Sequence, residues 1–201
     1  MKLKRGQWII AIFTLAYIIA FTIFYISKQN YEFLIYAGVL VVVGATVLLT
    51  INKSKLNYLA LWGLSLWGLI HLLGGSWIIN GTRLYGIRIV EIISGEGQFY
   101  ILKMDQVIHL YGFAVAAIVV FQLIYPRINK IHPGLIIFLA FIGSMGLGAL
   151  NEVVEFIAFL ALEKTGVGDL YNFGLDLVFN GIGALIGSII GYSTRKYVDK
   201  I

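Results

Sequence analysis

The main chemical signal in the sequence is a set of acidic and imidazole side chains within segments that are otherwise apolar. An ionisable group inside a membrane is costly, so each one marks a functional hypothesis by default. Carboxylates and imidazoles are the groups that bind divalent cations or relay protons. The set, with the asparagines that accompany it, is His71, Asp105, His109, Asn151, Glu152, Glu155, Asp176 and Asn180.

The spacing of these residues places most of them in pairs on helix faces. Residues three or four positions apart share one face of a helix. The pairs are Asp105 with His109, Glu152 with Glu155, and Asp176 with Asn180. Three consecutive apolar segments therefore each present two polar groups to one side, a pattern that a random scatter would not produce.

Glu152 and Glu155 form the pair that an apolar helix tolerates least. Two carboxylates at this spacing repel each other unless a cation, a proton or a basic group lies between them. Asp, Glu and His are acceptable ligands for Zn²⁺ or Mn²⁺, and a bound metal can activate water or hold a phosphate head group. We therefore predict a divalent cation, with Glu152, Glu155 and His109 as the catalytic candidates. The predicted metal ligands are Asp105, His109, Glu152, Glu155 and Asp176.

Three of these residues also have simpler structural explanations. Asp105 stands where a helix should begin, and aspartate is favoured as an N-cap. Asp176 and Asn180 suit hydrogen bonds that hold neighbouring membrane helices together. Capping does not account for His109, which follows Asp105 by one turn.

Polar residues near the ends of the segments are weaker candidates. His71 suits an interfacial histidine that hydrogen-bonds a loop carbonyl, or a ligand at the same depth as the acids. Asp169, Tyr171 and Asn172 suit a solvated loop first and a site second. We keep His71, Asn180 and Asp169 as candidate binding residues.

The elements that must position these groups are predicted to be membrane-spanning helices. Of the 201 residues, 60% are hydrophobic and 12% charged, whereas soluble domains have roughly 45–50% and 25%. A spanning helix needs roughly 20 apolar residues, and six segments qualify. The expected spans are about residues 8–27, 33–51, 58–79, 105–125, 134–162 and 171–192. The predicted fold is all-α, a polytopic membrane helix bundle that forms one integral membrane domain over residues 1–201.

The basic residues predict how the bundle is oriented. Ten Lys and Arg residues lie at the segment ends that share a side with the N-terminus, and five lie at the opposite ends. Because cytoplasmic loops are enriched in Lys and Arg, both termini are predicted to be cytoplasmic, in the plasma or inner membrane. At a rise of ~1.5 Å per residue, the ionisable groups then all fall in the outer half of the bilayer.

Other segments add to this picture. Gly183, Gly187 and Gly191 recur every four residues and predict close helix packing beside the site. The longest connection, residues 80–104, holds an alternating apolar stretch at 87–93 that suits an amphipathic piece lying on the membrane. The absence of cysteine excludes disulfides and thiolate sites. The net charge of +5 comes without a recognition motif, so nucleic acid is not an expected partner.

The last three segments resemble a known group of membrane proteins. Asp105-x3-His109, Glu152-x2-Glu155 and Asp176-x3-Asn180-x2-Gly183 are similar to patterns in the VanZ-like membrane proteins and in the related YjdF-type inner-membrane family. The resemblance covers about residues 100–192. It implies a multi-pass membrane protein, linked in some members to glycopeptide-antibiotic tolerance and the cell envelope, and supplies no established catalytic residues.

Three functions remain open at this point. The first is an enzyme or binding protein that acts on a lipid-linked or cell-envelope substrate at the outer leaflet, with membrane lipid as its partner. The second is a proton-coupled transporter or carrier, although the polar groups gather on one side and the halves show no inverted repeat. The third is a structural or scaffolding protein whose polar groups lock helix packing. The sequence indicates neither the substrate nor the oligomeric state.

Overall fold

Six long helices make up most of the chain, and each is long and apolar enough to cross a membrane. The computed structural model describes residues 3–91, 100–128, 132–163, 165–166 and 168–198. The helices are α1 (Arg5–Ser27), α2 (Tyr31–Ser54), α3 (Tyr58–Ser76), α4 (Met104–Ile124), α5 (Pro133–Ala161) and α6 (Leu170–Ser193). The predicted bundle of six spanning helices is confirmed, and every helix end lies within three residues of its expected position.

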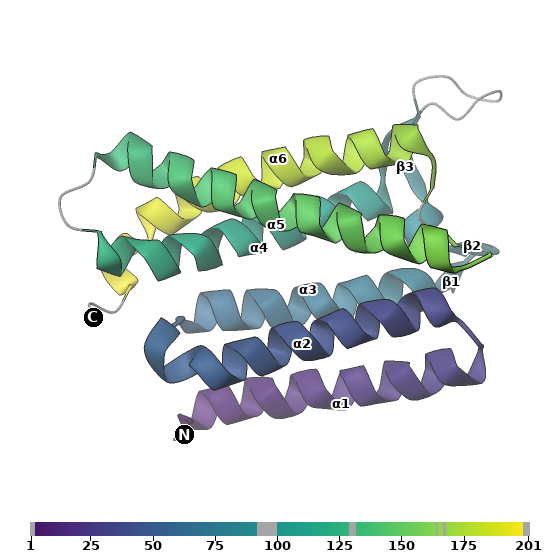
Figure 1. Cartoon of the computed structure of the whole chain (residues 1–201), viewed down its shortest axis with the longest axis horizontal. Helices are drawn as coiled ribbons and strands as arrows, with labels where there is room; N and C mark the ends of the chain where they lie inside the picture. Colours follow the sequence, from purple (N-terminus) through teal and green to yellow (C-terminus); the bar gives the residue numbers. More distant parts are fainter. Residues whose placement is uncertain (1–2, 92–99, 129–131, 164, 167, 199–201) are drawn as a thin grey trace.

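The helices run side by side along one axis, and both termini lie at the same end of the bundle (Figure 1). We call this end the terminal end. The opposite end, where α1, α3 and α5 finish and α2, α4 and α6 begin, is the distal end. That the terminal end faces the cytoplasm stays a prediction.

The fourth helix is the centre of the bundle. Helix α4 packs against α3, α5 and α6, while α1 packs against α2 and α3. The contact between α4 and α6 is the closest, because a Cβ added at Gly183 or Gly187 would overlap the carbonyl oxygen of Leu110 or Ala114. The glycine ridge of α6 therefore lies directly on the backbone of α4, as its spacing predicts.

Buried aromatic side chains join the first three helices. Tyr17 and Tyr25 of α1 donate hydrogen bonds to the backbone oxygens of Ser65 and Leu72 in α3, at 2.9 and 2.5 Å. The ring of Tyr25 stacks on Phe33 of α2. These contacts make α1–α3 a supporting layer beside the polar helices α4–α6.

The helix α3 ends three residues earlier than expected, at Ser76. Of the three residues beyond this end that were assigned to the helix, Ile78–Ile79 form β1 and pair with β2 (Thr82–Arg83). Asn80 and Gly81 connect them with φ angles of +50° and +82°. Asn-Gly is the preferred pair for such a two-residue hairpin turn, and this turn redirects the chain.

Most of the remaining distal connection is a second hairpin. After a short 3₁₀ turn, η1 (Leu84–Gly86), strand β3 (Arg88–Glu91) pairs with β4 (Tyr100–Lys103). All four residues of β3 are exposed. The alternating stretch predicted as an amphipathic piece is therefore a strand as far as residue 91, and its last residues lie outside the described part of the chain. Two further 3₁₀ turns, η2 (Tyr125–Arg127) and η3 (Arg195–Tyr197), follow α4 and α6 at the terminal end.

Candidate functional site

Five ionisable side chains from α4, α5 and α6 gather at the distal end of the bundle. None of them is more than 9% exposed, although the helices that carry them face outward over much of their surface. The five are Asp105, His109, Glu152, Glu155 and Asp176. The set contains two groups of possible metal ligands that share His109. Within each group the ligand atoms lie within 4.8 Å of one another, and the groups are Asp105, His109 and Asp176, and His109, Glu152 and Glu155.

His109 is the residue that connects the cluster. Its Nε2 atom lies 3.7 Å from Oδ1 of Asp105 and 3.9 Å from Oε1 of Glu155. Its Nδ1 atom lies 3.7 Å from Oε1 of Glu152. The cluster therefore surrounds the imidazole with carboxylates contributed by its own helix and by α5.

Asn180 of α6 fixes the orientation of this imidazole. Its Oδ1 lies 2.9 Å from Nδ1 of His109, and its Nδ2 donates to Oε1 of Glu152 at 3.4 Å. Because the amide nitrogen faces Glu152, the amide oxygen accepts from the Nδ1–H of His109. The Nε2 atom of His109 then faces Asp105 and Glu155. This is the arrangement in which proteins present histidine to a metal.

A second set of polar side chains closes the distal side of the cluster with short hydrogen bonds. Lys103 pairs with Oδ2 of Asp105 at 2.9 Å and donates to Oδ1 of Asn172 at 2.5 Å. Gln106 and Asn172 each donate to Asp176, both at 2.6 Å. These distances are those of charge-assisted hydrogen bonds, so this side of the cluster is well satisfied.

The prediction for Asn172 is wrong in one respect, because its side chain is only 2% exposed and does not belong to a solvated loop. The alternative role of Asp105 as an N-cap is also wrong, since Lys103 holds that position and Asp105 lies in the first turn. Asp169, in contrast, is exposed and caps α6 by accepting from the backbone nitrogen of Asn172 at 2.9 Å.

Three residues that border the site were not predicted from the sequence. Gln106 is fully buried, and Lys103 supplies a positive charge beside Asp105. Glu32, the second residue of α2, is 6% exposed and accepts from the backbone nitrogen of Gly166 at 2.8 Å. One signal was available for Gln106, which precedes His109 by three residues and therefore shares its side of the helix.

His71 lies apart from both groups of possible metal ligands, in an aromatic setting. Its Nδ1 is 2.6 Å from the hydroxyl of Tyr85, and the rings of Phe33, Tyr36 and Trp67 lie around it. The predicted loop partner of His71 is thus a tyrosine hydroxyl and not a backbone carbonyl. Burial raises the pKa of Tyr85 well above its ordinary value, so this hydroxyl keeps its proton.

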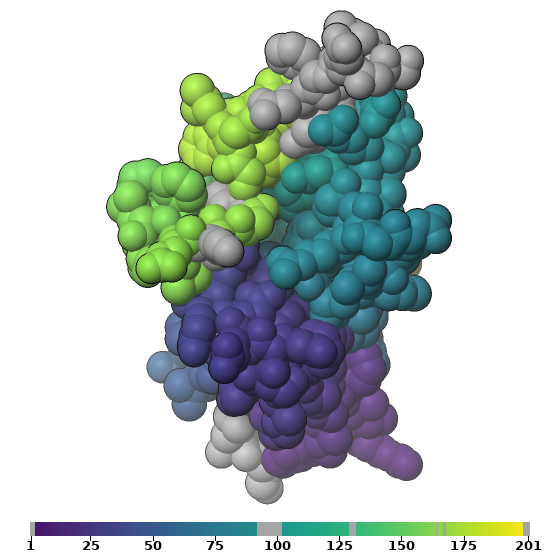
Figure 2. Space-filling view, turned by 90° about the vertical axis from the view of Figure 1, so that its right-hand side faces the viewer, coloured from purple at the N-terminus to yellow at the C-terminus, as the bar shows by residue number. Residues whose placement is uncertain are grey.

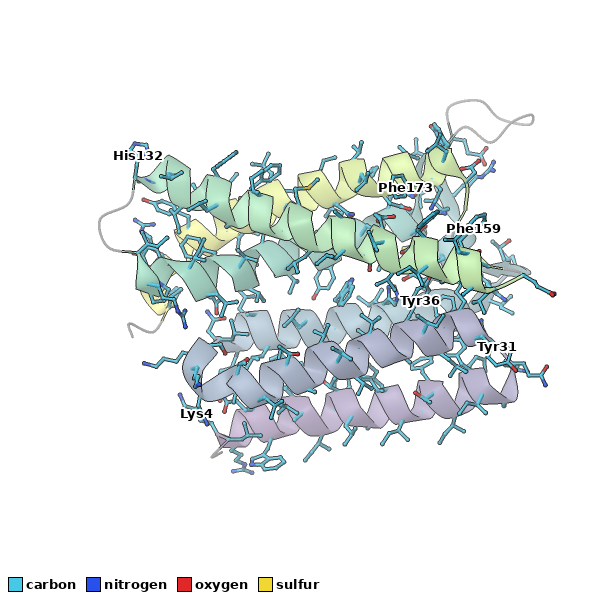
Figure 3. All side chains as sticks on the ribbon, viewed as in Figure 1. Lys4, Tyr31, Tyr36, His132, Phe159 and Phe173 are labelled. Atoms are coloured by element: carbon cyan, nitrogen blue, oxygen red, sulfur yellow. The ribbon has the colours of Figure 1, made fainter. Side chains whose placement is uncertain are left out.

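A groove between α5 and α6 gives the cluster an opening on the side of the bundle. The groove has a volume of about 610 Å³, Glu152 is the one cluster residue that lines it, and Asp169 stands at its rim. Figure 3 labels Phe159 and Phe173 on its two walls. Figure 2 looks onto the distal end, where the last part of α5 (green) stands out from the rest of the bundle.

Comparison with known proteins places the chain in a family. Residues 9–197 match the family described as predicted membrane protein (DUF2238). The chain belongs to the DUF2238 family. No curated protein and no solved structure matches it. The DUF2238 match includes residues of all six helices and gives no specific support for the VanZ-like or YjdF-type resemblance.

The geometry of this DUF2238 site suits an ion better than direct ion pairs. Charge-assisted hydrogen bonds have lengths of roughly 2.7–2.9 Å, and the contacts of Nε2 of His109 with the carboxylates of Asp105 and Glu155 are 3.7 and 3.9 Å. Two donors that share a tetrahedral metal at ~2.1 Å lie about 3.4 Å apart. The donors around Nε2 of His109 are therefore far enough apart to hold a small divalent cation.

Proposed function

We propose that this DUF2238 chain binds a divalent cation, Zn²⁺ or Mn²⁺, in the membrane and uses it on a lipid-linked or cell-envelope substrate. The observation that carries this proposal is the position of His109. Its Nε2 atom faces Asp105 and Glu155 at 3.7 and 3.9 Å, with the other ring nitrogen held by Asn180.

The charge balance of the cluster supports a bound cation. Four carboxylates lie together with one imidazole and, among the described residues, a single ammonium group, that of Lys103. Lys103 pairs with Asp105, so a proton, a charged imidazole or a bound cation has to offset the other three carboxylates. A divalent cation supplies that charge and also removes the repulsion between Glu152 and Glu155.

The proposed roles follow from position. His109, Asp105 and Glu155 hold the ion, and Asp176 stands behind it with its oxygens engaged by Gln106 and Asn172. Glu152 contacts both the cluster and the groove. It is therefore the group placed to accept a proton from a water or hydroxyl that the ion activates.

We place the distal end at the outer face of the membrane, because the terminal end carries the larger share of Lys and Arg. The VanZ-like resemblance of α4–α6 agrees with a role at the cell envelope. The carrier alternative receives less support, since α4 buries Phe113, Ile118 and Phe121 between the cluster and the terminal end. A proton path would have to cross that apolar stretch.

Elemental analysis of the purified protein tests the proposal. We expect about one Zn²⁺ or Mn²⁺ per wild-type chain and a loss of at least tenfold in Glu155→Gln. The matched control is Glu32→Gln, because Glu32 is also a buried acid at the distal end but belongs to neither group of possible ligands. Equal metal content in the two variants, or metal-free wild-type protein, would refute the metal site.

The same variants separate a functional site from a scaffold. If the cluster only locks helix packing, Glu155→Gln should lower the thermal unfolding midpoint in proportion to its structural role. We expect instead that metal-depleted wild-type protein and Glu155→Gln unfold at similar temperatures. A large further loss of stability in Glu155→Gln would favour the scaffold.

A further inference from the structure

The groove between α5 and α6 begins where the two helices separate. At Gly148 the helices cross closely, since a Cβ there would lie 3.1 Å from Nδ2 of Asn180. Beyond this point, toward the distal end, α5 and α6 diverge (Figure 1). The divergence opens the groove from Ala149 to Phe159 on α5 and from Leu177 to Leu170 on α6.

We propose that this groove binds the hydrocarbon chain of a long-chain lipid whose head group carries an ammonium. The head group and the bonds that join it to the chain lie at the rim beside Asp169, and the chain runs into the groove past Glu152. This inference rests on the proposed function, because it names the substrate class of the same site.

The surroundings of the groove identify its occupant as a lipid. Its walls continue onto the outer faces of α5 and α6, where Phe156, Phe159 and Phe173 are 55%, 54% and 37% exposed. In a bundle that spans the membrane, those faces are covered by lipid chains. A peptide in the same place would leave backbone N–H and C=O groups without partners, which is costly in hydrocarbon.

The length of the groove matches one leaflet. Ala149 lies near the middle of α5, and Phe159 lies two residues before its end. At ~1.5 Å per residue, the groove extends roughly 15 Å along the helix, which is half of the ~30 Å hydrocarbon thickness. Its volume of about 610 Å³ is within the range of roughly 300–1,000 Å³ for small-molecule sites.

The charges at the groove select the head group. Among the described residues that line it, the charged ones are Glu152 and Asp169, and none is basic. Two carboxylates favour an ammonium and repel a head group that is only anionic. Glu152 is seven residues before Phe159, so it lies roughly 10 Å below the rim, at the depth of the bound hydrocarbon chain.

Photolabelling in nanodiscs tests the inference. The probe is a phosphatidylethanolamine that carries a diazirine on its acyl chain, titrated into discs of neutral lipid. The blocking variant is Val153→Trp, in the groove and 50% exposed, and the control is Val178→Trp, which lies outside the groove and is 54% exposed. A second blocking variant, Leu177→Trp, fills the groove from the opposite wall.

We expect saturable labelling of about one lipid per chain in wild type and Val178→Trp, and a decrease of at least tenfold in both blocking variants. Unlabelled phosphatidylethanolamine should compete, and phosphatidylglycerol should not. Labelling of Val153→Trp at the level of Val178→Trp would overturn the lipid site, and equal competition by the two lipids would overturn the head-group assignment.

Metal content, measured on the same samples, keeps the two proposals apart. Val153→Trp should retain its metal while it loses the lipid, and Glu155→Gln should show the opposite behaviour. Saturable labelling that falls in Val153→Trp although wild type holds no metal would support the groove and refute the proposed function.

Discussion

The contact at Gly183 joins the stability of the bundle to the geometry of the site. At this position α6 lies against the backbone of α4, and an added Cβ would overlap the carbonyl oxygen and Cα of Leu110. Leu110 follows His109, and Gly183 follows Asn180 by one turn. Gly183→Ala must therefore separate the helices beside the 2.9 Å hydrogen bond between Asn180 and His109.

The expected cost follows from three contributions. Inserting a methyl group into a closely packed contact costs about 1–3 kcal/mol. A weakened hydrogen bond between membrane helices costs about 0.6–1.7 kcal/mol. Replacing glycine by alanine within a helix returns about 0.5–1 kcal/mol. The net loss is about 1–4 kcal/mol, or about 3–12 °C in the thermal midpoint of a chain of this size.

Thermal unfolding in detergent, followed by circular dichroism, measures this loss. The matched control is Gly174→Ala on the same helix, because a Cβ at Gly174 would have no neighbour within 4 Å. We expect the control to unfold at the wild-type temperature or slightly above it. A Gly183→Ala protein as stable as Gly174→Ala would refute the close contact of α4 with α6.

Three further predictions concern the surroundings of the site. Asn180→Ala should weaken metal binding 10- to 100-fold in a chelator competition, because the orientation of the imidazole is lost; unchanged affinity would contradict that role. Lys103→Met should lower the free energy of unfolding by about 1–3 kcal/mol, since it leaves the largely buried carboxylate of Asp105 without its ion pair. Arg88→Met, which removes an exposed ion pair, should cost less than about 1 kcal/mol, and an equal cost for both would argue against burial as the cause. Because the pKa of Tyr85 is raised when folded, its contribution to stability is complete below about pH 10 and is lost as pH rises above that value. Tyr85→Phe should reduce this alkaline loss in unfolding measured between about pH 9 and 11, and an identical pH dependence would contradict it.

The helices were predictable because the hydropathy and length of a segment indicate whether it can span a membrane. A span must be long and apolar whatever it packs against, so the boundaries of α4, α5 and α6 are each within one residue of expectation. The end of α3 was not predictable by hydropathy, since Ile78 and Ile79 are as apolar as the helix before them. The Asn80-Gly81 turn decides it, and its backbone preference is a signal of a different kind.

The ionisable residues of the site were predictable from the sequence, because burying a charged side chain in an apolar segment costs free energy. Carboxylates and imidazoles stand out in an apolar segment, whereas an amide such as Asn172 does not, because near a helix start it also suits a solvated end. Extending the polar stripe of α6 by one turn would have found it, since Asn172, Asp176 and Asn180 are spaced by four. Glu32 is not part of a polar stripe on its helix. Its burial is explained by the fold, which brings the backbone nitrogen of Gly166 within hydrogen-bonding distance of its carboxylate.

The contrast between the two parts of the cluster is the strongest argument against a purely structural role. A network that only stabilises packing is expected to close all its hydrogen bonds, and the part built around Asn172 and Asp176 does so at 2.5–2.6 Å. The contacts of Nε2 of His109 with Asp105 and Glu155 stop at 3.7 and 3.9 Å in the same buried environment, while Oε1 of Glu155 accepts from Nδ2 of Asn151 at 2.9 Å. Direct ion pairs would be shorter, so the spacing around Nε2 of His109 supports the cation that we propose.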